Sequence, residues 1–450
     1  MEKKQTDIEQ FGYKQELKRG LTFSDILIYG LIFMVPIAPF GVYGEVMVGA
    51  QGMVALAYLI GMVGMIFTAL SYARMSEEFP LAGSVYSYVG RGINHHLGFI
   101  AGWLILLDYL LIPTLMYVVS AAALGGILPG VPAGVWIIIF VVINTVINYF
   151  GIEMTAKTNK IFLVFEIIVL ILFLIFGITA IVNGVNGATF SFDPLYNPDR
   201  FSMSLVLGAV SIAVLSFLGF DAISTLSEES KGGPKAIGRG MVYSLLIVGV
   251  LFIVQTWVAA LIFPDFNSFA DIDTAFYETA EIAGGKWLGV LTAIATALAW
   301  GIADALVAQA AISRVLYSMA RDKKLPRFLS KVHPKYQTPY ASTLLVAGIS
   351  VILGFVFIGG IDVLASLVNF GALSAFLLLN ISVFYHFMVK KKSKDFFRYL
   401  ILPLIGFIIV GFVWVNFNAS TQILGFSWLS VGVVIAIILA VKGKNTDLEL

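Results

Sequence analysis

The stretch Met34-Val-Pro-Ile-Ala-Pro-Phe-Gly-Val-Tyr-Gly44 decides the fold, because it lies inside an apolar run that covers residues 22–49. Proline lacks an amide hydrogen, and in a helix its ring clashes with the carbonyl group four residues earlier. We therefore expect the carbonyl groups of Ile32 and Val35 to be freed from helical hydrogen bonds. Two glycines follow the two prolines and allow the chain to unwind.

Unpaired backbone in the middle of a membrane is tolerated only where protein or a water-filled cavity satisfies it. A plain proline kink is the simpler interpretation, but two prolines followed by two glycines favour a functional break. Freed carbonyl oxygens suit an ammonium group, and the N-terminus of the second half-helix suits an anion. The residues that we expect to bind substrate here are Val35, Pro36, Ile37, Ala38, Pro39, Gly41 and Tyr43.

Further apolar runs accompany this one, and each is near the ~20 residues that a helix needs to cross a bilayer. Hydrophobic residues make up 59% of the 450 residues and charged residues only 12%, which exceeds what a soluble core needs. The sequence predicts an all-α integral membrane protein with 12 transmembrane helices, at residues 22–49, 51–73, 97–125, 133–150, 157–182, 203–227, 239–263, 287–318, 340–358, 362–388, 398–417 and 424–441.

Positive charge is divided unequally between the gaps that separate these runs. Of the 28 Lys and Arg residues, 26 lie in alternate gaps and the two tails, and only Arg200 and Lys286 lie in the other gaps. Basic residues favour the cytoplasmic side of a membrane. We therefore expect both termini in the cytoplasm and a multi-pass position in the plasma (inner) membrane. The outer gaps then include an acidic loop at residues 264–286.

Composition and motifs also limit the class of function. The chain has no cysteine and only four histidines, so we expect no metal centre and no thiol nucleophile. A membrane enzyme would need a nucleophile and base or metal ligands, and an ion channel would need a selectivity-filter repeat. We find neither, nor a Gly-x-x-x-x-Gly-Lys loop for ATP. We expect transport driven by an ion or solute gradient, with no cofactor and no nucleic-acid partner.

A second interruption is predicted in the run at residues 203–227. The chain there reads Ser216-Phe-Leu-Gly-Phe-Asp-Ala-Ile-Ser-Thr-Leu-Ser-Glu-Glu229, with Gly219 close before a membrane-embedded Asp221. Interruptions at matching positions of two halves of a chain are typical of a transporter binding site.

Three stretches resemble the amino acid–polyamine–organocation (APC) transporter superfamily. They are the segment just quoted, Ser71-Tyr-Ala-Arg-Met-Ser-Glu-Glu-Phe-Pro-Leu-Ala-Gly-Ser-Val-Tyr-Ser-Tyr88 with the later Gly98-Phe-Ile-Ala-Gly-Trp103, and Ser313-Arg-Val-Leu-Tyr-Ser-Met-Ala-Arg-Asp-Lys-Lys-Leu-Pro326. Together with the number of helices, the resemblance covers nearly the whole chain. It implies a leucine-transporter-type fold with two inverted five-helix repeats, discontinuous helices 1 and 6, and two extra C-terminal helices. The implied divisions are a cytoplasmic tail at 1–21, repeats at 22–182 and 203–388, helices 11 and 12 at 398–441, and a cytoplasmic tail at 442–450.

The first break departs from the pattern of the superfamily. Its amino acid permeases usually have a glycine-rich break whose amides hold the substrate carboxylate, whereas Pro36 and Pro39 have no amide hydrogen. This difference favours solutes without a carboxylate, and the chain looks closest to the putrescine-importer branch. The resemblance therefore implies a secondary active transporter that imports a small cationic amine, most of all putrescine or a related polyamine, by alternating access. A broad-specificity amino acid permease and an amine or amino acid exchanger are the alternatives.

Carboxylates inside apolar runs are costly and usually functional. We expect Asp108 and one of Asp221 and Asp304 to receive the two ammonium groups of a diamine. Hydrogen bonding between helices is the alternative role of each. Aromatic rings nearby would add cation–π contacts of roughly 0.5–2 kcal/mol each. The remaining candidates for the substrate site are Tyr109, Phe217, Gly219, Phe220 and Trp300.

Glu166 lies in the run at residues 157–182. In proton-coupled members of the superfamily the matching position is often Lys, where sodium sits in related carriers. Removal from water favours the protonated form of a carboxyl group, so Glu166 is our candidate for the proton-coupling residue. A hydrogen bond between helices is the other interpretation, and sodium coupling stays open. The expected partners are a small-molecule substrate, a proton and the lipid bilayer, and the oligomeric state stays open.

Overall fold

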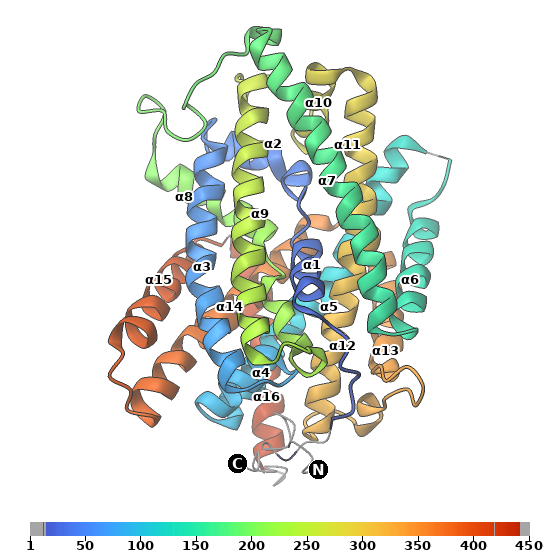
Figure 1. Ribbon diagram of the computed structural model, residues 1–450, viewed down its shortest axis with the longest axis vertical. Helices are drawn as coiled ribbons and strands as arrows, with labels where there is room; N and C mark the ends of the chain where they lie inside the picture. Colours follow the sequence, from blue (N-terminus) through green and yellow to red (C-terminus); the bar gives the residue numbers. More distant parts are fainter. Residues whose placement is uncertain (1–11, 13–14, 129, 418, 442–450) are drawn as a thin grey trace.

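The computed structural model describes residues 12, 15–128, 130–417 and 419–441. Within these ranges the chain is helical (Figure 1), apart from turns and an isolated bridge between Leu21 and Ser230. Most of the predicted N-terminal tail and the whole predicted C-terminal tail, residues 442–450, lie outside the described residues.

The helices up to residue 182 are α1 (Phe23–Phe33), α2 (Pro39–Gly49), α3 (Val54–Glu78), α4 (Ser84–Gly92), α5 (His95–Ile127), α6 (Ala133–Tyr149) and α7 (Ile152–Val182). The later ones are α8 (Met203–Ala213), the 3₁₀ segments η3 (Val214–Phe217) and η4 (Phe220–Glu229), α9 (Pro234–Ile262), α10 (Ala275–Gly284), α11 (Lys286–Leu298), the π-helical η6 (Ala299–Asp304), α12 (Ala305–Arg321), α13 (Tyr340–Val356), α14 (Ile361–Phe384), the π-helical η9 (Phe397–Ile401), α15 (Leu402–Val415) and α16 (Ala419–Val441).

Nine helices or runs of joined helices in the described ranges are long and apolar enough to cross a membrane. The surface of α7 shows why they do not form a soluble bundle. A stripe of large apolar side chains recurs every three or four residues along α7 and is exposed, which is the spacing of one face of a helix. Its members are Ile161, Val164, Ile168, Ile171, Ile175, Ile178 and Val182. A stripe of this kind is suited to contact with lipid, which indicates a multi-pass membrane protein.

Helix α5 lies at the centre of the molecule, and most of its apolar residues are buried. It packs against α4, α12 and α14, and α3 packs along α9 (Figure 1). The start of α1 has a capping box, because the Thr22 side chain accepts from the Asp25 amide and Asp25 accepts from the Thr22 amide at 3.0 Å. Lys160 of α7 also reaches Asp25, at 2.7 Å, and links the first helix to the fifth predicted span.

One end of the molecule is closed by ion pairs between segments that are far apart in the sequence. Arg314 pairs with Glu229, and both side chains are buried. Arg321 pairs with the buried Glu228 at 2.8 Å, and Lys391 pairs with Glu78 at 2.5 Å. We call this end, where η4, α12 and the C-terminus of α3 meet, the ion-paired end.

The segment before α1 lies on the same end. The amides of Gly20 and Leu21 both donate to the Glu229 carbonyl at 3.1 Å, and the Lys231 amide donates to the Leu21 carbonyl at 2.8 Å. Tyr317 of α12 donates to Glu16 at 2.7 Å. Residues 15–21 therefore cover the ends of η4 and α12.

The acidic region at residues 264–286 is not the plain loop that its composition suggests, because it contains α10. Ala275, Phe276, Thr279 and Ala280 of α10 are buried, while Glu281 is exposed. Part of the acidic region is therefore an amphipathic helix.

Candidate functional site

The first predicted span is interrupted where the two prolines lie. Helix α1 ends at Phe33 and α2 begins at Pro39, and Val35 has a φ of +48°. A left-handed conformation at a β-branched residue is rare, and it turns the chain sharply between the two half-helices.

The hydrogen bonds at this break correct one expectation. The Ile32 carbonyl accepts from the Val35 amide at 3.1 Å, and the Val35 carbonyl accepts from the Ala38 amide at 2.7 Å. The prediction that both carbonyls are freed was wrong, because the chain tightens from four-residue to three-residue spacing and reuses them. The Pro36 carbonyl instead accepts from the Gln255 side chain of α9, at 2.9 Å.

The sixth predicted span is interrupted at Gly219. After η3, Leu218 is extended and Gly219 has a φ of +108°, before η4 begins at Phe220. A Cβ atom on Gly219 would lie 1.9 Å from the ring of Phe33, so a side chain does not fit there. Phe33 is the last residue of α1, and the two interruptions therefore touch.

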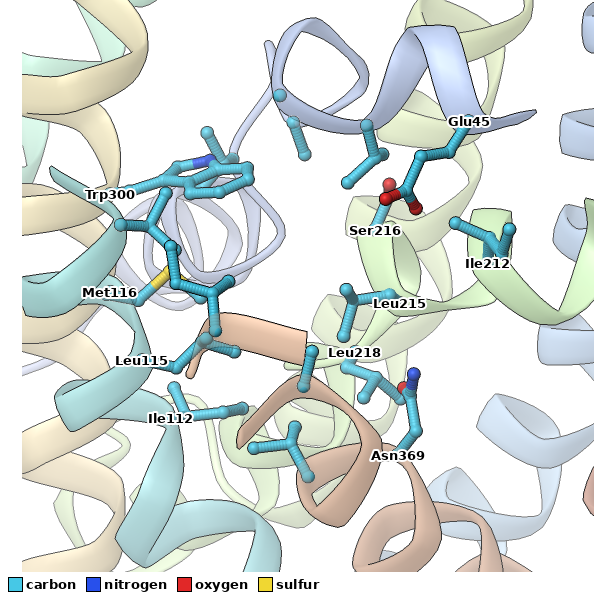
Figure 2. A pocket seen from close by; sticks show the side chains of 18 of the residues that line it. Glu45, Ile112, Leu115, Met116, Ile212, Leu215, Ser216, Leu218, Trp300 and Asn369 are labelled. Atoms are coloured by element: carbon cyan, nitrogen blue, oxygen red, sulfur yellow. The ribbon is translucent and has the colours of Figure 1, made fainter. Parts of the chain in front are cut away.

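A cavity of about 930 Å³ lies beside both interruptions. Figure 2 shows Glu45 and Ser216 on one side of the cavity and Trp300 with Met116 and Leu115 on the other. Its lining also includes turn residues between α13 and α14 and between α15 and α16, at the end opposite to the ion-paired end. Glu45 is exposed, so the cavity is accessible from that side.

The predicted site residues divide into two groups. Those that line the cavity are Val35, Ala38, Gly41, Trp300 and Asp304. Those that do not are Pro36, Ile37, Pro39, Tyr43, Asp108, Tyr109, Phe217, Gly219, Phe220 and Asp221.

Asp304 is the predicted carboxylate that reaches the cavity. Asp304 is the last residue of the π-helical segment η6, and Trp300 lies four residues earlier in the same segment. Its side chain is 6% exposed, and its Oδ1 atom has no hydrogen-bond partner within the described part of the chain. A buried oxygen without a partner is uncommon in native proteins and is satisfied when a ligand or water donates to it.

Asp221 is held by side chains instead. Its Oδ2 atom accepts from the hydroxyl groups of Tyr109 and, at 3.5 Å, of Tyr72. It is fully buried behind the cavity wall, so its contacts here are between helices.

The sequence of the whole chain matches a known family. The profile of the amino acid permease family covers residues 20–441. This chain belongs to that family. The resemblance to the APC superfamily is thereby confirmed, and the permease is a membrane transporter and not an enzyme.

Individual relatives of this permease align over nearly its full length. It is 32% identical over 426 residues to the low-affinity putrescine importer PlaP of Escherichia coli (strain K12), and the alignment covers 93% of each chain. It is 28% identical to the branched-chain amino acid permease BcaP of Bacillus subtilis (strain 168), over 94% of this chain and 93% of the relative. It is 27% identical to the methylthioribose transporter of the same organism, over 94% and 92%.

Two further buried carboxylates of the permease lie close to Asp304 but outside the cavity lining. Asp108 of α5 is 1% exposed, and it is near enough to interact electrostatically with Asp221 and Asp304. Glu166 of α7 is fully buried, and neither of its oxygens has a hydrogen-bond partner among the described residues. It too lies within electrostatic range of Asp304.

Sequence reasoning missed several polar residues of the cavity. Glu45 was not among the expected site residues, although it follows the predicted Gly41 by one helical turn and so shares its face. Asn369 of α14 lines the cavity with its Oδ1 atom unpartnered within the described ranges (Figure 2). No sequence signal distinguishes this asparagine from those elsewhere in the apolar runs.

Proposed function

We propose that this permease imports a small cationic amine, putrescine or a related polyamine, by proton-coupled secondary active transport. Asp304 is the observation that carries the proposal, because it is a buried carboxylate with an unpartnered oxygen, among the described residues, at the wall of the cavity. An ammonium group supplies both the positive charge and the hydrogen-bond donors that this oxygen lacks. The similarity to PlaP, a putrescine importer, supports the same class of solute.

The charge of the lining supports a cation over an anion. Among the described residues that line the cavity, Glu45 and Asp304 are acidic, and none is Lys, Arg or His. An α-amino acid would need donors for its carboxylate, and the prolines at positions 36 and 39 have no amide hydrogen to give. Trp300, which is 8% exposed, offers a ring face to a cation in the same lining.

We assign a leucine-transporter-type arrangement to the fold. The nine apolar spans, the span formed by α1 and α2, and the 17-residue helices α6 and α13 make twelve crossings. The two repeats are residues 22–182 and 203–388, followed by helices 11 and 12 at 398–441. The contact between Phe33 and Gly219 supports this assignment, because it joins interruptions in the first span of each repeat.

The basic residues give the orientation. The ion-paired end carries the loops that are rich in Lys and Arg, so we place that end and both termini in the cytoplasm. The cavity then opens to the outside, as an importer needs before it binds substrate. Access alternates when the ion-paired end opens and the outer side closes.

Glu166 is the group that we assign to proton coupling. It is buried on α7, and it interacts electrostatically with Asp304, to which we assign substrate binding. A buried carboxyl group without a hydrogen-bond partner among the described residues takes up a proton when it is removed from water and releases it when water returns, which is what a coupling group needs.

Uptake by the purified protein in liposomes tests the proposal. We expect saturable uptake and counterflow of labelled putrescine, stimulated by an inward proton gradient and unaffected by a sodium gradient. Excess leucine should compete weakly and excess cadaverine strongly. Uptake of leucine in preference to putrescine would instead assign the protein to the amino acid permeases, as for the relative BcaP, and non-saturating flux would indicate a channel.

A further inference from the structure

Among the described residues, Glu45 and Asp304 are the acids that line the cavity. The two elements that carry them meet at one aromatic contact. The contact joins α2 to η6: a Cβ atom on Gly41 would lie 2.5 Å from the Trp300 ring, so the indole packs directly on the backbone of α2. Trp300 and Gly41 thus hold together the two elements that carry the acids.

The two acids lie on two different elements that meet at this contact. Glu45 follows Gly41 by four residues in α2, which runs toward the open side of the cavity, where Glu45 is exposed. Asp304 follows Trp300 by four residues in η6, which continues into α12 and toward the ion-paired end. Both acids therefore line one cavity from two different elements, which the contact between Trp300 and Gly41 joins.

An extended diamine with a short spacer can join two acids that line one cavity. The five bonds between the nitrogens of putrescine advance by roughly 1.2 Å each, which gives about 6 Å. A charge-assisted hydrogen bond adds about 2.8 Å at each end. Putrescine can therefore join two carboxylate oxygens that are about 12 Å apart.

The two sites differ in what they offer to an ammonium group. Asp304 is buried and lacks a partner for its Oδ1 atom within the described ranges, so it binds a cation strongly and sets its position. Glu45 is at the mouth, where solvent and salt weaken an ion pair. A monoamine uses the first site alone, and only a second cationic end reaches the mouth.

We propose that Glu45 receives the outer ammonium group of a diamine whose inner ammonium group is bound by Asp304, and that this pair of acids makes the cavity selective for α,ω-diamines over monoamines. The proposal rests on amine transport as proposed above and adds to it the residue that distinguishes diamines from monoamines. Neither Asp108 nor Asp221 takes this role, because neither lines the cavity.

The first experiment removes the charge of Glu45 and keeps its shape. Reconstituted Glu45→Gln protein should have a KM for putrescine that is about threefold to tenfold higher than that of the unmodified protein at low salt. The inhibition constant of 1-butylamine should change less than twofold, and the difference should shrink as ionic strength rises. Glu281→Gln is the matched control, because Glu281 is an exposed acid of α10 outside the cavity lining.

A second variant tests distance rather than charge. Glu45→Asp keeps the carboxylate but withdraws it by one methylene, so the preference should move from putrescine toward the five-carbon cadaverine. Equal melting temperatures in detergent would show that the variants fold alike.

The outcomes separate this inference from the proposed function. Wild-type protein that takes up no amine would overturn both. If wild-type protein takes up putrescine, and Glu45→Gln changes the constants for putrescine and 1-butylamine equally or not at all, the role of Glu45 is wrong and amine transport stands. Unchanged length preference in Glu45→Asp would also overturn it.

Discussion

Arg314 of α12 and Glu229 at the end of η4 form an ion pair whose side chains are only 5% and 3% exposed. The guanidinium group donates from both Nε and Nη2 to the carboxylate, and its Nη1 atom donates to the Ala310 carbonyl at 2.7 Å. The charges are thus paired and hydrogen-bonded, which is the condition under which a buried ion pair is tolerated.

Removing one charge of this pair should destabilise the protein strongly. Glu229→Gln leaves Arg314 buried without a counter-charge, at a cost of about 3–5 kcal/mol. The melting temperature in detergent should fall, and replacing both residues with Gln and Met should restore much of it. The control is Asp395→Asn, which breaks the exposed pair with Arg398 and should change the melting temperature little. Equal effects of the two single changes would contradict the assigned burial.

Asp304→Asn should lower the affinity for putrescine. The variant removes the buried charge that the ammonium group needs, and truncation of one partner of such a contact costs about 2–5 kcal/mol, or about 30-fold or more in KM. Asp221→Asn is the comparison, because Asp221 is held by Tyr109 and Tyr72 outside the cavity lining. We expect that variant to melt at a lower temperature and to keep its KM within about threefold. A reversed pattern would assign the substrate to Asp221.

Glu166→Gln should separate uptake from the proton gradient. An amide of the same shape cannot take up and release a proton, so net accumulation under an imposed pH gradient should be lost while putrescine counterflow continues. Folding should be preserved, because the buried carboxyl group has no hydrogen-bond partner to lose among the described residues. Accumulation that still follows the pH gradient in this variant would exclude Glu166 as the coupling group.

Trp300→Leu should weaken binding of every amine, whether it has one charge or two. Loss of the ring removes a cation–π contact of about 0.5–2 kcal/mol, which corresponds to a KM roughly twofold to 30-fold higher. Trp300→Phe should have an intermediate value. Trp287→Leu, at an exposed position of α11 outside the cavity, should leave the KM unchanged. The measurement is again uptake of labelled putrescine in liposomes.

Gly219→Ala should disrupt the contact between the two interruptions. The added Cβ atom meets Phe33, and alanine is strained at a φ of +108°. We expect a lower melting temperature and a loss of uptake. Gly208→Ala is the control, because a Cβ atom there meets nothing within 4 Å on the regular helix α8, and it should leave stability equal or higher. If both variants behave alike, the backbone at Gly219 is not the constraint described here.

The sequence was sufficient for the features that depend on local chemistry. Runs of apolar residues predict where the spans lie, because their length must match the bilayer. The capping box at Thr22 and the interruption at the prolines both follow from neighbouring residues, and the structure contains both. The exposed stripe of α7 could also have been read from its spacing.

The sequence was insufficient for features that depend on which side of a helix faces the cavity or on a partner far away in the chain. Asp108 was expected to bind substrate together with Asp221 or Asp304, but of the three only Asp304, at the end of the π-helical η6, lines the cavity. The carbonyl that is bound at the first break is that of Pro36, and its partner Gln255 is 219 residues away in the chain. Neither the side of a helix that faces the cavity nor a pairing between distant residues follows from neighbouring residues, so neither could be predicted.

The backbone hydrogen bonds between residues 20–21 and Glu229, with the return bond from Lys231 to Leu21, tie the start of α1 to the end of η4. The halves of both interrupted spans that lie at the ion-paired end are therefore tied together. Each can bend at its interruption, at Val35 and at Gly219. A displacement of α1 carries η4 with it unless these bonds break. We therefore expect the ion-paired end to open by a concerted movement of α1 and η4.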